Sequence, residues 1–430
     1  MTSSRFRLFA PFASVWLITA AAFGARVAFL WHQQRVIPHE VLAQVPFNQE
    51  AGNIALALSQ GHGFSNLFRQ ATGPTAWLPP VYPFVLSLIF RIFGAFTFAS
   101  FIAAALLNCA FSAAATPPLY DLARRVSGRG VAVASGWIWV LLPAGILMPT
   151  EWIWDTSLSV LLAVTVVWAT VRHAESVQLR HWLRYGVLWA LALLTNPSLG
   201  IILPFLFVWL MLRVRSHPSF SWRAPVFSLL LLVACCLPWT LRNFAQFHRV
   251  IPVRSSFAFE LWIGNNDVFD PHAVGGKQRI TRFEETRHYA QLGEAAYLAE
   301  KRELGTSFIR QKPALFFLLS EKRFVATWTG TEHPWHDLRE TESQLARVVI
   351  VVNLALAIGT ACGILLLAAK KSPFWVPLAA GPIFYPLVYY ITHTSLRYRH
   401  PIDPLLVLLT ILAAFAFARP NRPKTGFKSI

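Results

Sequence analysis

The chain has 430 residues, of which 55% are hydrophobic and 13% charged, and its mean hydropathy is +0.48. These values exclude an ordinary soluble domain and predict an all-α, polytopic integral membrane protein. The formal net charge of +18 could indicate nucleic-acid binding, but the basic residues fall mainly in short connections between apolar runs. Because cytoplasmic loops and anionic headgroups favour that placement, we expect membrane lipids as partners and no nucleic acid.

Hydropathy predicts about ten transmembrane helices. The stretch 81–95 is too short to span a bilayer and carries Arg91, so we expect an interfacial helix there. Asn196-Pro197 must interrupt a helix, which predicts a hairpin of partial depth around it. The expected spans are residues 8–30, 99–121, 130–148, 156–172, 183–195, 198–214, 225–241, 346–368, 373–391 and 402–418.

The basic connections set the predicted orientation. If residues 81–95 do not span, the connections rich in Arg and Lys all fall on one side, which is the cytoplasmic side by the positive-inside rule. Both termini are then cytoplasmic in an inner membrane of bacterial type, and the segments 31–98, 149–155, 242–345 and 392–401 face outside. We divide the chain into an N-terminal transmembrane module (1–241) with its first external loop (31–98), a partly helical external region (242–345), and C-terminal helices with a short cytoplasmic tail (346–430).

The first candidate functional residue is Glu50, which follows the first span. An uncompensated carboxylate is rare in so apolar a chain, and the membrane edge beside a site of chemistry is one place that tolerates it. Asn53 comes three residues later, so the two side chains share one face of a helix that Gly61 and Gly63 should end. The alternative is that Glu50 is a structural helix residue.

Two further acids occur in the turn after Pro149. Glu151 and Asp155 are four residues apart and would project together from the outer end of a helix pair. Asp155 could alternatively cap the next helix. Trp152 lies beside Glu151 and would offer either a surface on which a sugar stacks or part of an interfacial aromatic belt.

Basic residues on the predicted outer side depart from the positive-inside pattern. Arg242-Asn243 closes one span, Arg254 follows it, and the last outer turn reads Arg397-Tyr398-Arg399-His400. The planar guanidinium binds two phosphate oxygens at once, so these residues suit a phosphate ligand. Contact with ordinary phospholipid phosphate is the alternative interpretation.

The order of these motifs resembles the GT-C superfamily of membrane glycosyltransferases, in the branch of the protein O-mannosyltransferases (glycosyltransferase family 39) and the aminoarabinose transferase acting on lipid A. The resemblance covers residues 45–420, although relatives place Asp where this chain has Glu50. It rests on Glu50 with Ile54-Ala55, Gly61-His62-Gly63-Phe64-Ser65, the stretch 72–83 that contains Tyr82, Leu122-Ala123-Arg124-Arg125, Glu151, Leu194-Thr195-Asn196-Pro197, Trp239-Thr240-Leu241-Arg242-Asn243 and Tyr398-Arg399-His400-Pro401.

The resemblance implies an inverting glycosyltransferase that moves a sugar from a polyprenyl-phosphate donor to a lipid, glycan or protein acceptor at the outer membrane face. It implies that Glu50 is the general base and that Glu151, with Asp155, completes an acidic pocket. Arg397 and Arg399 would then stabilise the leaving phosphate, with help from Arg242. The other substrate contacts on this reading are Asn53, Tyr82, Trp152, Asn243, Tyr398 and His400.

Some relatives hold a divalent ion with their loop acids and others work without one. Glu50, Glu151 and Asp155 would be enough to hold Mg²⁺ or Mn²⁺. A flippase or transporter of lipid-linked sugars is an alternative function, but it favours ionisable groups near the bilayer midplane. A non-catalytic membrane subunit with the same fold is the other alternative.

Overall fold

The computed structural model describes residues 13–47, 50–68, 70–174, 176–266 and 282–418. Over these ranges the chain is helical without any named strand, and a single isolated bridge joins Ser65 to Pro74. The expected all-α fold is therefore confirmed. Residues 8–12 of the first expected span and the tail 419–430 lie outside the described residues.

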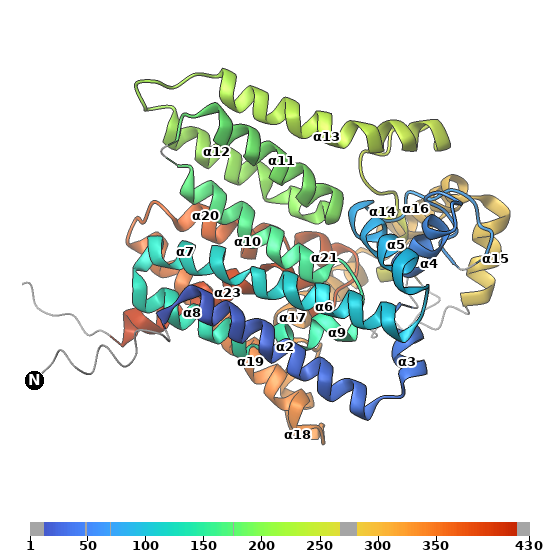
Figure 1. Cartoon of the computed structure of the whole chain (residues 1–430), viewed down its shortest axis with the longest axis horizontal. Helices are drawn as coiled ribbons and strands as arrows, with labels where there is room; N and C mark the ends of the chain where they lie inside the picture. The colour runs from blue at the N-terminus through green and yellow to red at the C-terminus, as the bar shows by residue number, and fades with distance from the viewer. Residues whose placement is uncertain (1–12, 48–49, 69, 175, 267–281, 419–430) are drawn as a thin grey trace, which may run out of the picture.

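The helices follow one another with short connections in both halves of the chain (Figure 1). In the first half they are α2 (Val15–Val36), α3 (His39–Gln44), η2 (Val45–Phe47), α4 (Glu50–Ser59), α5 (Val81–Phe93), α6 (Phe98–Ala114), α7 (Thr116–Ser127), α8 (Arg129–Leu141), α9 (Pro143–Glu151), α10 (Thr156–Arg172), α11 (Leu179–Thr195), η3 (Pro197–Ile201) and α12 (Leu203–Val214). They continue with α13 (Arg223–Phe247), α14 (Phe257–Gly264), α15 (Arg282–Leu292), α16 (Glu294–Gln311), α17 (Pro313–Thr329), α18 (Pro334–Glu340), α19 (Gln344–Ala369), α20 (Trp375–Phe384), α21 (Leu387–Ile391), α22 (Leu396–Arg399), η4 (His400–Ile402) and α23 (Asp403–Phe417).

Length and composition allow five described helical segments to cross a membrane, or six if α8 and α9, bent by 44°, form one span. The chain is thus a multi-pass membrane protein, and each expected span coincides with a helix or a helix pair. Helices α10, α12 and α20 are apolar but short, so the number ten stays a prediction. The five segments are α2, α6 with α7, α13, α19, and α22 with α23.

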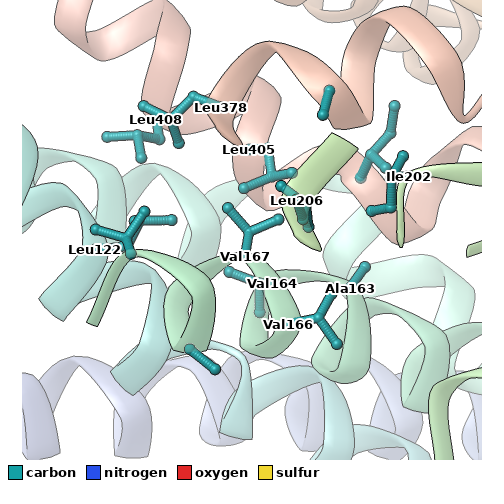
Figure 2. Packing of buried hydrophobic residues seen from close by; sticks show 14 of the residues in the cluster. Leu122, Ala163, Val164, Val166, Val167, Ile202, Leu206, Leu378, Leu405 and Leu408 are labelled. Atoms are coloured by element: carbon teal, nitrogen blue, oxygen red, sulfur yellow. The ribbon is translucent and has the colours of Figure 1, made fainter. Parts of the chain in front are cut away.

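The largest core forms around α10 (Figure 2). Most positions of this helix are buried, including Ala163, Val164 and Val167, and the partly exposed ones, Leu161, Thr165, Trp168 and Arg172, fall on one face. Leu206 of α12 and Leu405 of α23 pack into the same cluster. A central helix packed on most sides gives the neighbouring segments a rigid frame.

The two expected interruptions of the helical pattern are present. Helix α11 ends at Thr195, and the Asn196 side chain accepts a hydrogen bond from the Ser198 amide at 3.1 Å, which starts the 3-10 turn η3. Residues 81–93 form the short helix α5, which buries Tyr82 and exposes Leu88 on its other side. That two-sided pattern suits an interfacial helix.

The segments expected outside gather at one end of the bundle, at the right of Figure 1, where α4, α5, α14, α15 and α16 lie together. The buried Glu294 carboxylate ties them to one another. It accepts hydrogen bonds from the Ala76 amide at 2.8 Å, from Ser255 Oγ at 2.7 Å, from Tyr289 Oη at 2.8 Å and from Thr75 Oγ1. The segment from α4 to α5 and the helices α14, α15 and α16 are therefore one packed unit.

Candidate active site

A cavity of about 310 Å³ lies where this packed unit meets the bundle. Its volume falls at the lower end of the range for small-molecule sites. Its charged walls come from segments far apart in the sequence: the start of α4, the turn before α10, helix α14 and the segment 392–398. The lining residues that carry chemistry are Glu50, Tyr82, Asp155, Asn196, Arg254, Glu260, Tyr389, His393, Arg397 and Tyr398.

Glu50 is the first residue of α4 and lines the cavity. The helix ends at Ser59, and Gly61 follows with a φ of 83°, as the sequence predicted. Asn53, one turn after Glu50, is buried and donates a hydrogen bond to the Leu67 carbonyl at 2.9 Å. Asn53 therefore fixes the loop behind the helix, and the cavity lining does not include it.

Asp155 occupies the N-cap position of α10, as the capping interpretation required, but its side chain makes no capping bond. It accepts a hydrogen bond from Ser159 Oγ at 2.9 Å and lines the cavity. Burial raises the pKa of the Asp155 carboxyl above its ordinary value, although Arg397 and Arg254 act in the opposite direction. A carboxylate with this environment remains a stronger base than a solvated one.

Arg397 is the cation at the centre of the site. Its guanidinium lies over the rings of Trp154 at 4.8 Å, Tyr398 at 5.0 Å and Trp152 at 5.3 Å. It also interacts electrostatically with Asp155 and Glu50. Nη2 donates to Tyr398 Oη at 3.3 Å, whereas Nη1 is buried without a hydrogen-bond partner among the described residues. A buried guanidinium nitrogen left unpaired in a cavity is a binding group for an anion.

A second row of polar side chains supports Arg397. The Tyr398 hydroxyl lies 2.9 Å from His393 Nε2, and His393 Nδ1 lies 3.3 Å from Glu260 Oε2. Burial lowers the pKa of the His393 imidazole, while Glu260 acts to raise it. The sequence interpretation missed both residues, although Glu260 is an acid in the apolar run Phe257–Trp262 and the reasoning applied to Glu50 would have found it.

Two other predicted basic residues serve the fold. Arg399 is buried, with Nε 3.0 Å from Asp403 Oδ1 and Nη2 2.7 Å from Asn353 Oδ1. His400 Nδ1 lies 2.8 Å from Asp403 Oδ2, and its ring stacks on Trp139. Arg399 and His400 were expected to face the ligand with Arg397. Their positions do not match this expectation, because neither residue lines the cavity.

Arg242 and Asn243 hold the loops of the packed unit. Arg242 donates to the carbonyls of Thr75 at 2.7 Å and Phe64 at 2.6 Å, and Asn243 donates to the Ile251 carbonyl at 3.0 Å. Neither lines the cavity, whereas Arg254 does. The sequence analysis placed Arg254 among the basic residues that suit a phosphate ligand, but the resemblance assigned the phosphate to Arg397, Arg399 and Arg242 instead.

Glu151 stands apart from the other two predicted acids. It is the last residue of α9, it is exposed, and it does not line the cavity. Trp152, next to it, is 38% exposed and reaches the site through its contact with Arg397. Within the described residues no group of three or more His, Cys, Asp or Glu is arranged to hold a metal ion. The divalent ion that Glu50, Glu151 and Asp155 were expected to hold stays a prediction.

Comparisons with known proteins agree with this architecture. Residues 78–241 match the family model described as dolichyl-phosphate-mannose-protein mannosyltransferase. The apo crystal structure of the oligosaccharyltransferase of Archaeoglobus fulgidus is similar over 96% of this chain and 51% of that one, with a TM-score of 0.56 and 14% identity. A crystal structure of that enzyme tethered to an acceptor peptide with the NVT sequon gives coverages of 93% and 49%, a TM-score of 0.51 and 12% identity. No curated protein sequence matches significantly.

The chain therefore has a fold similar to that of the Archaeoglobus fulgidus oligosaccharyltransferase, and the resemblance to membrane glycosyltransferases inferred from its motifs is also found by the family model over residues 78–241. It spans about half the length of the solved structures that it matches. The matched family segment contains Tyr82 and Asp155 of the cavity.

Proposed function

We propose that this protein is an inverting glycosyltransferase that moves a sugar from a polyprenyl-phosphate donor to a lipid, glycan or protein acceptor at the outer face of an inner membrane. The observation that carries the proposal is the buried Nη1 of Arg397, which has no hydrogen-bond partner among the described residues and shares a cavity with Glu50 and Asp155. A phosphate-binding cation beside carboxylates is what this transfer needs. The family model matched by residues 78–241 is named for a donor of this class.

Glu50 serves as the general base in this mechanism. The proton of the acceptor hydroxyl passes to the Glu50 carboxylate, and the acceptor oxygen attacks the anomeric carbon of the sugar. The bond from that carbon to the phosphate oxygen breaks, and its electron pair leaves with the polyprenyl phosphate. One displacement of this kind inverts the anomeric configuration.

Arg397 and Arg254 bind the phosphate and stabilise the charge that it gains as the bond breaks. Arg254 replaces Arg399 as the second cation, because Arg254 lines the cavity and Arg399 is saturated by protein partners. Asp155, which shares the cavity with both cations, accepts hydrogen bonds from the sugar hydroxyls. Trp154 and Tyr82 offer aromatic walls on which a sugar can stack.

Transfer suits the position of the charges better than transport does. A transporter is expected to line a path near the midplane with ionisable groups. Arg26 of α2 is a buried cation within a span, but its nitrogens donate to Ser112 Oγ and to the carbonyls of Ala22 and Trp139. Arg26 is thus bound into the helix packing, and the acids and cations of the cavity lie at helix ends.

The test is lipid and glycan mass spectrometry of a strain that lacks the protein, with complementation. We expect a missing hexose, pentose or amino-sugar mass, which the wild-type chain restores and the Glu50→Gln chain does not. Glu151→Gln is the matched control, since it changes an acid that the cavity does not include, and it should restore the mass. Unchanged envelope glycans in the deletion strain, together with no transfer by the purified protein from polyprenyl-phosphate sugars, would contradict the proposal.

A further inference from the structure

A second cavity, of about 410 Å³, lies at the other end of the bundle. It forms between the start of α2, helix α7 and the latter part of α10, toward the left of Figure 1. One wall is apolar, with Val15, Pro117, Pro118 and Leu161. The opposite rim carries Asp121, Arg124, Trp168 and Arg172. None of these residues has a role in the proposed glycosyl transfer.

The rim has an excess of positive charge. The Asp121 carboxylate is 2.8 Å from Arg124 Nη2, 2.7 Å from Arg125 Nε and 4.0 Å from Arg172 Nη1. Three guanidinium groups around one carboxylate leave a net charge of +2 in this cluster. The side chains of Arg124 and Arg172 are 58% and 48% exposed, so both can still reach a ligand.

His173, which follows the last residue of α10, lies in the same positive environment. Burial lowers the pKa of its imidazole to about 4, and His181, Arg172 and Arg125 act in the same direction. Arg172 and Arg125 thus make the surroundings of His173 positive. The sequence does place Glu175 in the following connection, outside the described residues.

The second cavity is a slot whose rim is held in place by contacts within the protein. Trp168 Nε1 donates to Asp121 Oδ2 at 2.9 Å, and the Arg172 guanidinium lies 5.0 Å from the Trp168 ring centre. Tyr120 Oη donates to the Ala13 carbonyl at 3.0 Å, which holds the start of α2 against α7. Two consecutive prolines, Pro117-Pro118, keep amide donors out of the apolar wall.

We propose that this second cavity binds one anionic phospholipid. Its phosphate contacts Arg124 and Arg172, and an acyl chain lies against the wall formed by Val15, Pro117 and Leu161. Basic pockets between transmembrane helices bind acidic headgroups in this manner.

Two observations favour a lipid over free phosphate or a protein partner. Free phosphate gains no free energy from contact with an apolar wall, whereas a lipid contacts the wall and the cations together. Trp16, next to Val15, is 72% exposed, so the slot adjoins an apolar surface that suits the bilayer.

The experiment measures lipid retention by native mass spectrometry of the full chain. The protein is delipidated in detergent and titrated with phosphatidylglycerol or phosphatidylcholine. We expect one tightly held phosphatidylglycerol and weaker phosphatidylcholine binding. The double variant Arg124→Gln with Arg172→Gln should weaken phosphatidylglycerol binding roughly 25-fold, at about fivefold for each cation near an anionic surface. The matched control is Arg213→Gln, which removes an arginine that contacts Trp209 and not this cavity.

A second variant tests the slot without changing the charge at the rim. Leu161→Trp fills the apolar side of the cavity, and it should remove the retained lipid while the protein keeps its thermal stability. Millimolar inorganic phosphate should not displace the lipid. Equal retention of phosphatidylglycerol by wild type and both variants would overturn the proposal. Preferential retention of polyprenyl phosphate over phosphatidylglycerol would also overturn it, because the occupant would then be the donor lipid.

Discussion

Arg397 and Arg399 stand two residues apart in the four-residue helix α22. Around Arg399, a core cluster with Asp403, Asn353 and His400 pairs the guanidinium with an acid and an amide. Around Arg397, the cavity cluster with Glu50, Asp155 and Tyr398 leaves Nη1 without a hydrogen bond among the described residues. Arg399 is fully buried and Arg397 is half-buried, and the two also differ in whether the protein itself satisfies the charge. A satisfied cluster stabilises a fold, and an unsatisfied one is ready for a ligand.

The largest effect is expected from the cavity acid. Glu50→Gln keeps the shape of the side chain but cannot accept a proton, so turnover should fall by about 10²–10⁴-fold. Glu50→Asp should keep part of the activity. Transfer rates with a defined polyprenyl-phosphate sugar, alongside thermal unfolding, separate activity from stability. Wild-type turnover in Glu50→Gln would move the base to Asp155.

The core cluster should respond in the opposite way. Asp403→Ala leaves the buried Arg399 without its acid partner, which typically costs about 3–5 kcal/mol of stability. We expect reduced yield and a lower unfolding temperature in detergent. Asp403→Asn, which keeps part of the hydrogen bonding, should be milder. A fully stable Asp403→Ala protein with weakened donor binding would mean that the core cluster belongs to the site.

The third prediction concerns the cavity cations. Arg397→Ala should weaken binding of the donor lipid by about 1.5–3 kcal/mol, the range for a hydrogen bond to a charged group, and leave the fold intact. Arg254→Ala should have a similar or smaller effect. Donor affinity measured by titration calorimetry in nanodiscs tests both. Unchanged affinity in the double variant would remove the phosphate-binding role.

The smallest effect concerns His393 and pH. Because its pKa is lowered in the folded protein, the unfolded chain binds more protons between that value and its ordinary pKa. His393 therefore contributes to a loss of stability as the pH falls from about 6.5 toward the lowered value. The slope is at most about 1.4 kcal/mol per pH unit. The free energy of unfolding is measured against pH for wild type and for His393→Gln, and the difference between the two curves gives the contribution of His393. Identical curves would contradict a lowered pKa of His393 in the folded protein.

Hydropathy predicted most of the helical architecture, because apolar run length constrains a membrane helix strongly. The break at Asn196-Pro197 and the short helix at 81–93 follow from local rules for proline and length. The number of spans does not follow so directly, because α10 and α12 are apolar helices of only 17 and 12 residues.

The site was predictable only in part. Glu50 and Asp155 share the cavity as expected, but the pairing of Glu151 with Asp155 assumed an unbroken helix. Helix α9 ends at Glu151, and Trp152 has extended backbone angles, so the four-residue spacing no longer places the two acids together. The separate position of Arg399 could have been predicted from its spacing to Arg397, because residues two apart on a helix point to different faces. Arg254 and His393 meet in the cavity through tertiary packing, which no local pattern encodes.

The Glu294 carboxylate also bears on how the protein is made. Its partners Thr75 and Ala76 precede it by 219 and 218 residues. At ordinary elongation rates of about 5–20 residues per second, the ribosome needs roughly 10–45 s to synthesise the intervening chain. During that interval the segment that contains Thr75 and Ala76 has been synthesised but lacks the acceptor for its buried donors. The packed unit can therefore complete these hydrogen bonds only after residue 294 has been made.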